Sequence, residues 1–190
     1  DFPPRTYVAP GGPIAIVRIE QGQRRFALVR WGFIPSWVKE LKPGKPLINA
    51  RGETVAEKPS FRDAFERRRC LVPADGFYEW KAEGRIKQPY YFSMKSCESF
   101  ALGGVWESWR VPDGSILRTC CLITTGPNDI MLPVHDRMPV IVSPADHDAC
   151  SQESQRMRWP ITADVMQTWA VNTRVSWSVE EGTDPIKPLT

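Results

Sequence analysis

The chain has 190 residues, 42% of them hydrophobic, and its 25 basic and 22 acidic side chains leave a formal net charge of +3. This length suits one compact domain, no apolar run approaches the roughly 18 residues that cross a bilayer, and no signal-peptide pattern is present, so membrane and secreted proteins are disfavoured. The small net charge neither predicts nor excludes a nucleic-acid partner, because a basic patch rather than a basic total makes a phosphate-binding face.

The first predicted elements are two strands, residues 14–19 and 26–31. A loop follows with the text Trp31-Gly32-Phe33-Ile34-Pro35-Ser36-Trp37. Trp37 lies in a turn flanked by proline and serine, so its ring could stack on DNA bases or wedge between them. The alternative is a core tryptophan.

The stretch Leu47-Ile48-Asn49-Ala50-Arg51-Gly52-Glu53-Thr54 alternates apolar side chains with polar ones that cannot stay buried unpaired. Basic side chains around it could supply phosphate contacts, or could form only a solvated basic loop. They are Lys39, Lys42, Lys45, Arg51 and Arg62.

A helix is predicted after Pro59-Ser60, where Phe61, Ala64 and Phe65 have i, i+3, i+4 spacing. Strands at 70–73 and 77–81 come next. In the second, alternation puts Phe77 and Glu79 on one face and Tyr78 and Trp80 on the other. Within a partly apolar cleft the pKa of Glu79 would rise, which suits a group that gives and takes a proton; the alternative is an outward-facing strand glutamate.

Strands at 90–94, 100–106 and 117–124 follow, with turn residues at Glu83-Gly84 and Pro112-Asp113-Gly114 that indicate hairpins. The block Val134-His135-Asp136-Arg137-Met138-Pro139 comes after an irregular stretch. A histidine between such neighbours can act as a general acid or base, or can simply bond loop carbonyls.

The last predicted elements are a strand at 140–142, a helix beginning at Ser143-Pro144 and a helix running from Thr162 towards Trp169. Together the elements predict an α+β fold: a single compact domain over residues 1–190 with an antiparallel, barrel-like β core and a few packed helices. The cysteines number five, an odd count, and lack a Cys-x-x-Cys pair. Disulfides, a metal site and a cofactor are therefore not expected.

Four blocks occur in order: Trp-Gly-x-x-Pro-x-Trp, Ile-Asn-Ala-Arg-x-Glu-Thr, Asp-Gly-Phe-Tyr-Glu-Trp and His-Asp-Arg-Met-Pro. In these the chain resembles the SOS response-associated peptidase (SRAP) family, strongly from Arg5 to Val142 and more loosely around Ala170 to Val175. The resemblance implies a DNA damage response protein that binds single-stranded DNA and covalently traps abasic sites, as a thiazolidine, through a cysteine at its own N-terminus. It also implies autoproteolytic removal of a short pro-segment by that cysteine.

The resemblance implies a set of site residues. Glu79, His135 and Asn49 match the family's catalytic side chains, with Glu79 as the proton donor to the sugar and His135 assisting the proton transfers. The predicted DNA-binding residues are Arg51, Trp37, Pro10, Thr124 and Trp80. Single-stranded DNA with abasic sites is the expected partner of a monomer in the bacterial cytoplasm, associated with the nucleoid.

Three departures from the family pattern stand out. Tyr7 precedes Val8-Ala9-Pro10 where the family commonly has asparagine, and Trp37 is followed by Val38 rather than a second tryptophan. The sequence also begins at Asp1 without a Cys-Gly-Arg type of start. We therefore expect the segment with the catalytic cysteine to precede Asp1.

Two rival functions remain open from the sequence. One is a peptidase that acts on other proteins with Glu79, His135 and an internal nucleophile. The other is a non-catalytic module that only binds single-stranded DNA.

Overall fold

Short strands make up most of the regular structure in the computed structural model, which describes residues 7–41, 44–147, 161–176 and 186–189. The strands are β1 (Pro13–Glu20), β2 (Gln23–Trp31), β3 (Asn49–Arg51), β4 (Arg69–Ala74), β5 (Phe77–Glu83), β6 (Ile86–Met94), β7 (Phe100–Arg110), β8 (Ile116–Thr125), β9 (Met138–Pro139), β10 (Ile141–Val142) and β11 (Met166–Ala170). The α-helix α1 spans Arg62–Arg67, and single 3₁₀ turns cover Pro144–Asp146, Ala163–Val165 and Thr173–Ser176.

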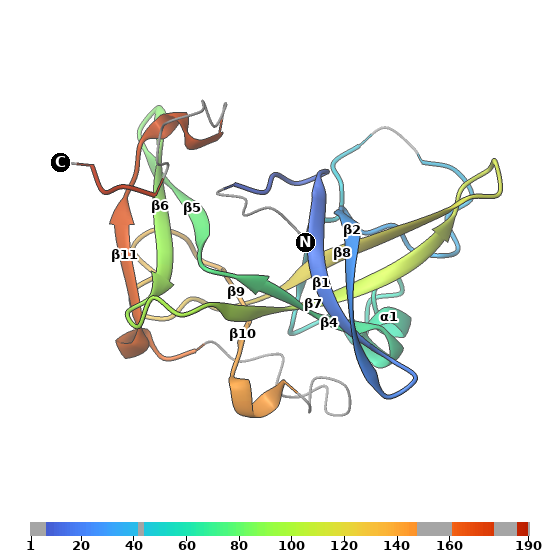
Figure 1. Ribbon diagram of the computed structural model, residues 1–190. Coiled ribbons are helices and arrows are strands. Elements are labelled where there is room, and N and C mark those ends of the chain that lie inside the picture. The colour runs from blue at the N-terminus through green and yellow to red at the C-terminus, as the bar shows by residue number, and fades with distance from the viewer. Residues whose placement is uncertain (1–6, 42–43, 148–160, 177–185, 190) are drawn as a thin grey trace.

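A closed barrel forms the larger part of the fold (Figure 1). Strands β7, β4, β1, β2 and β8 pair in that order, and β8 pairs back with β7 to complete the ring. β10 extends the barrel at β7, while β3 and β9 both pair with β8. The predicted barrel-like core is confirmed, but it is not wholly antiparallel, because β8 runs parallel to β2 and to β3.

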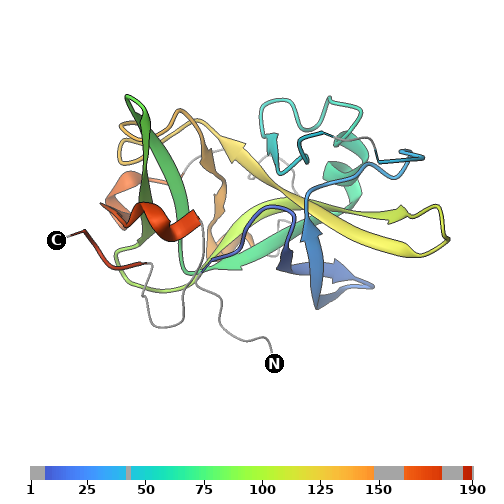
Figure 2. The ribbon, with the colours of Figure 1, turned by 90° about the horizontal axis from the view of Figure 1, so that it is seen from above.

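A second sheet of β11, β6 and β5 stands beside the barrel, and the view from above shows the same separation (Figure 2). Both of its pairings are antiparallel, with Glu79 opposite Tyr90. The Phe77 ring stacks on Phe92 at 5.2 Å between centroids and belongs to the main core, whereas Tyr78 and Trp80 belong to a separate aromatic cluster. The predicted alternation of β5 is therefore confirmed.

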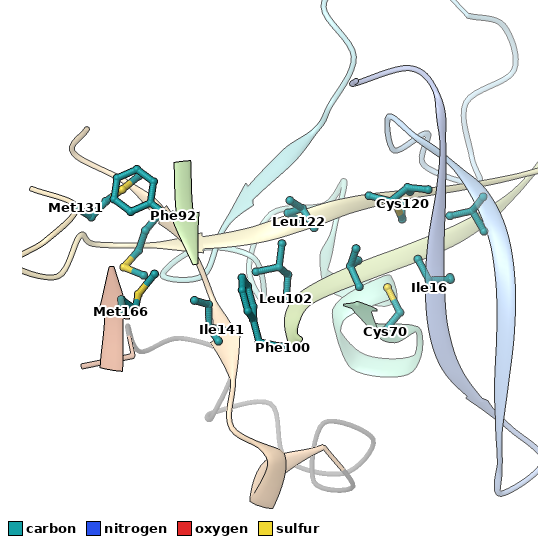
Figure 3. Packing of buried hydrophobic residues seen from close by; sticks show 14 residues of the cluster. Ile16, Cys70, Phe92, Phe100, Leu102, Cys120, Leu122, Met131, Ile141 and Met166 are labelled. Atoms are coloured by element: carbon teal, nitrogen blue, oxygen red, sulfur yellow. The ribbon is translucent and has the colours of Figure 1, made fainter. Parts of the chain in front are cut away.

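One apolar core runs from the barrel into the second sheet (Figure 3). Ile16 and Cys120 lie in it at the barrel side, and Phe92, Met131 and Met166 lie in it at the sheet side. Each such buried side chain contributes about 1.5 to 3 kcal/mol relative to exposure. The shared core fixes β5 relative to β8, and these two strands carry the candidate site.

The predicted helix from Thr162 towards Trp169 is wrong. After the turn Ala163–Val165 the chain becomes β11 and pairs with β6. Met166 enters the main core while Trp169 packs on Tyr91 with ring centroids 5.4 Å apart, so the residues alternate between two buried surfaces as a strand requires.

The prediction of packed helices was overstated. The helix expected at Ser143-Pro144 is only the turn Pro144–Asp146 within the described residues, and residues 148–160 lie outside them. The helix predicted after Pro59-Ser60 is confirmed as the six-residue α1, which buries Ala64 and Phe65. The fold is mostly β. Among the described residues, none of the helices has the length and apolar character needed to cross a membrane.

Candidate active site

Glu79 lies in β5 on the face that carries Phe77, next to the main core. Burial raises the pKa of its carboxyl group above the ordinary value. The Trp80 backbone N–H, which donates to Glu79 Oε1 at 3.0 Å, and the charges of His135 and Lys87 oppose this rise, whereas Asp136 adds to it. A carboxyl group in this environment keeps its proton to a higher pH than a free glutamate does.

His135 lies in the loop between β8 and β9, close enough for its charge to act on Glu79. Its Nδ1 accepts a hydrogen bond from the Arg137 backbone N–H at 3.0 Å. The Asp136 carboxylate and the Arg137 carbonyl also lie near Nδ1, at 3.2 and 3.3 Å. The ring is 41% exposed, so a substrate can reach it.

The loop that carries His135 is held by Asn128. The Asn128 side chain donates to the Ile161 carbonyl at 3.0 Å and accepts from the Met131 N–H at 3.1 Å. Met131 is fully buried, and its carbonyl accepts from the His135 N–H at 3.0 Å. The hydrogen bonds of Asn128 and the buried side chain of Met131 thus fix the backbone that leads to His135.

Asn49 and Arg51 project from β3 on one face, because Ala50 between them is buried and strand side chains alternate. β3 pairs in parallel with the end of β8, with Arg51 opposite Thr124. The Thr124 side chain is buried at this point. The structure thus brings together the predicted residues Asn49, Arg51 and Thr124.

An ion pair connects β3 to the His135 loop. The Arg137 guanidinium donates to both carboxylate oxygens of Glu53, at 2.7 and 2.8 Å, and to the Thr124 carbonyl at 2.6 Å. The hydrogen bond from Arg137 lowers the pKa of Glu53, with smaller contributions from the charges of Arg137 and Arg51. Sequence reasoning missed this pair. The sequence did offer one signal for it: Glu53 and Arg137 have opposite charges and lie in two motif blocks that both supply site residues.

Trp37 is 65% exposed in the loop after β2. The loop itself is fixed, since Val38 N–H donates to the Pro35 carbonyl at 3.1 Å and the Trp109 ring N–H donates to the Val38 carbonyl at 2.6 Å. Lys39, Lys45 and Arg62 are exposed, as the basic-loop interpretation requires, while Lys42 lies outside the described residues.

Pro10 and Trp80 lie in two different settings. Pro10 is exposed in a turn that is tied to the end of β2 by the hydrogen bond from Gly11 N–H to the Trp31 carbonyl. Trp80 is half-buried on the opposite face of β5, where its ring packs on Tyr78. Tyr7 packs on the same Tyr78 ring at 5.8 Å between ring centroids.

A hollow among the described residues lies away from these side chains. It has a volume of about 230 Å³ and lies where β1 meets β4, lined by Arg18, Arg24, Arg67, Arg69 and His147 among others. It includes none of the predicted site residues.

Both the sequence and the fold of this chain match known proteins. A family model described as SOS response associated peptidase (SRAP) matches residues 1–178. Two abasic site processing proteins of Bacillus subtilis (strain 168), YoqW and YoaM, are similar in sequence. YoqW is 39% identical over 184 residues, and the match covers 93% of this chain and 82% of YoqW. YoaM is 38% identical over 185 residues, and the match covers 93% of this chain and 81% of YoaM. A crystal structure of a Bacteroides thetaiotaomicron protein matches the fold with a TM-score of 0.81 and 23% identity, covering 95% of this chain and 82% of that one.

Proposed function

Because this chain belongs to the SOS response associated peptidase (SRAP) family, we propose that it processes abasic sites in DNA by binding single-stranded DNA and trapping the abasic sugar covalently. The names of the relatives YoqW and YoaM, abasic site processing proteins, support this substrate class. The proposal is carried by the half-buried Glu79, whose carboxyl group has a raised pKa and lies within reach of the charge of His135.

A protonated carboxyl group is what the first chemical step needs. An abasic sugar exists mostly as a closed ring, so a proton delivered to the ring oxygen by Glu79 helps to release the aldehyde. An amine then adds to the aldehyde and loses water to give an imine, and a thiol closes onto the imine carbon as a thiazolidine. His135 assists these proton transfers, while Asn49 holds the sugar and Arg51 contacts a flanking phosphate.

The nucleophile that we propose is an N-terminal cysteine upstream of Asp1, because a thiazolidine needs an amine and a thiol on one residue. Two internal thiols in β8 are poor alternatives. Burial raises the pKa of Cys120 to about 12 and that of Cys121 well above the ordinary value, so neither forms a thiolate near neutral pH. The same N-terminal cysteine would serve the autoproteolytic activity.

The rival peptidase that acts on other proteins has weaker support. A general base needs a nucleophile within hydrogen-bond reach, about 2.6 to 3.2 Å. Among the described residues, the groups that contact His135 Nδ1 are the Asp136 carboxylate and the Arg137 backbone. No hydroxyl or thiol of these residues donates a hydrogen bond to this nitrogen. The Thr124 hydroxyl already accepts from Arg137 at 3.3 Å.

A denaturing gel tests the proposal directly. Full-length protein whose first residue is a cysteine, its Glu79→Gln variant and a chain that starts at Asp1 are each mixed with single-stranded DNA that contains one abasic site. We expect a heat-stable protein–DNA band from the first protein, formed about 100 times more slowly by Glu79→Gln because glutamine cannot donate the proton. DNA affinity should change little in this variant. A heat-stable band from the Asp1 chain would refute the proposed nucleophile, and binding without any band would favour the non-catalytic module.

A further inference from the structure

Arg137 joins three separate segments of the chain at the candidate site. Its guanidinium contacts Glu53 in the turn after β3 through two short hydrogen bonds, and contacts the carbonyl and hydroxyl of Thr124 at the end of β8. The Thr124 carbonyl also accepts from the Gly52 N–H at 2.8 Å. The turn after β3, the end of β8 and the His135 loop therefore meet at one guanidinium group.

This set of contacts, the Arg137 clamp, fixes geometry as well as adding stability. The Glu53 side chain is 51% exposed, so water screens part of its attraction to Arg137, while the two parallel hydrogen bonds set the direction of the guanidinium group. The Arg137 Nε is buried and has no hydrogen-bond partner among the described residues, which costs free energy. The clamp thus holds the guanidinium group in one direction even though one of its N–H groups is left unpaired, which is compatible with a positioning role.

The backbone of the same arginine selects the form of the His135 ring. The Arg137 N–H donates to Nδ1 at 3.0 Å, which requires that Nδ1 carries no proton and that the neutral ring carries its proton on Nε2. The Asp136 carboxylate and the Arg137 carbonyl would instead accept from a protonated Nδ1. The position of the Arg137 backbone N–H relative to Nδ1 therefore favours one tautomer over the other.

We propose that Glu53 is a positioning residue for His135, acting through Arg137. With Glu53 in place, the guanidinium group keeps its position, the backbone N–H of Arg137 stays hydrogen-bonded to Nδ1, and Nε2 carries the proton of the neutral ring. The catalytic consequence rests on the proposed function, but the effect on the His135 ring does not.

Nuclear magnetic resonance of histidine rings tests the ring effect without any DNA. The chain has two histidines, so ¹⁵N-histidine spectra contain the rings of His135 and His147, and a His147→Gln variant identifies each. We expect the neutral His135 ring to be protonated at Nε2 in the wild type and to become a mixture of tautomers in Glu53→Gln. Glu57→Gln is the matched control, because it removes an exposed charge from the same segment without touching Arg137. An unchanged His135 tautomer in folded Glu53→Gln would overturn the inference.

Single-turnover adduct formation tests the catalytic consequence. We expect Glu53→Gln to slow the reaction about tenfold at unchanged DNA affinity, since a displaced catalytic ring loses rate rather than binding, and Glu53→Asp to restore part of the rate. Equal rates in Glu53→Gln and Glu57→Gln would also overturn the inference. If the wild type itself forms no adduct, the proposed function fails, and the ring spectra alone decide on the clamp.

Discussion

At the scale of single residues, Glu79 shows a conflict between stability and chemistry. Burial favours the neutral carboxyl group, so keeping this side chain ionised in the folded protein costs free energy. The Trp80 N–H and the nearby histidine compensate only in part, because the pKa remains raised. Sites that must transfer protons commonly retain such a cost, since the same environment that destabilises the charge keeps the proton available.

Replacement of Glu79 by glutamine should therefore stabilise the protein in a pH-dependent manner. Below the pKa of an unfolded glutamate both states are protonated, and the variant and the wild type should be equally stable. As pH rises through the window between that value and the raised folded value, the unfolded state releases its proton first, so the wild type loses stability relative to the variant. Above the window we expect Glu79→Gln to be more stable by about 0.5 to 2 kcal/mol.

Urea unfolding at a series of pH values measures this difference. Glu98→Gln is a suitable control, because Glu98 is exposed in the turn after β6 and its replacement should leave the pH dependence unchanged. A Glu79→Gln variant that is less stable than the wild type at neutral pH would contradict the proposed cost of burying this carboxylate.

At the scale of elements, the corner between β4 and β5 sets where Glu79 lies. A Cβ atom on Gly76 would come within 2.2 Å of Tyr91 Cζ and 2.6 Å of the Phe92 carbonyl. Tyr91 is buried and packs between Tyr78 and Trp169, so it cannot move aside cheaply. Glycine at this corner allows β5 to begin directly against β6.

Gly76→Ala should consequently destabilise the second sheet and disturb the site. We expect a loss of about 1 to 3 kcal/mol in the free energy of unfolding, as for other overpacked positions, together with slower adduct formation because β5 shifts. Thermal unfolding and the denaturing gel measure the two effects. Gly44→Ala, where the added Cβ meets no atom within 4 Å, should change neither. Wild-type stability in Gly76→Ala would indicate that Tyr91 has an alternative position.

The long strands could be predicted from sequence because their apolar alternation is local. Each predicted strand overlaps one of those found, and Phe77 and Glu79 share a face as expected. β3, β9 and β11 were not predicted, since strands of two or three residues, or one flanked by a turn, depend on partners distant in sequence. Met166 to Trp169 fits helical spacing as well as alternation, and only the pairing with β6 decides between them.

For the candidate site too, some features could be predicted from local sequence and others depended on the fold. Asn49, Arg51, Thr124 and His135 gather around the end of β8, and the charge of His135 reaches Glu79 on β5. Their residue types and the motif resemblance were sufficient to propose them. The contact between Glu53 and Arg137, 84 positions apart, could not be read from local pattern, because only the closed barrel brings the two segments together.

At the scale of the whole molecule, the net charge of +3 is too small to attract DNA over a distance. The proposed binding of a single strand then depends on a local set of phosphate contacts together with base stacking. These two contributions differ in their response to salt. Phosphate contacts release counterions and weaken as salt rises, whereas stacking on an aromatic ring is nearly independent of salt.

Two substitutions should therefore weaken single-strand binding in distinguishable ways. Arg51→Gln should reduce the slope of log affinity against log salt by about 0.7, the value for one phosphate contact on a single strand. Trp37→Ala should lower the affinity at every salt concentration by about 1 to 3 kcal/mol while leaving the slope unchanged, because it removes a stacking surface and no charge. Fluorescence anisotropy with a labelled single strand at several salt concentrations measures both quantities. The matched controls are Arg25→Gln and Leu28→Ala, at exposed positions on β2, a strand that carries none of the proposed site residues. Should Trp37→Ala change the slope, or Arg51→Gln leave it unchanged, the assignment of stacking to Trp37 and of phosphate contact to Arg51 would fail.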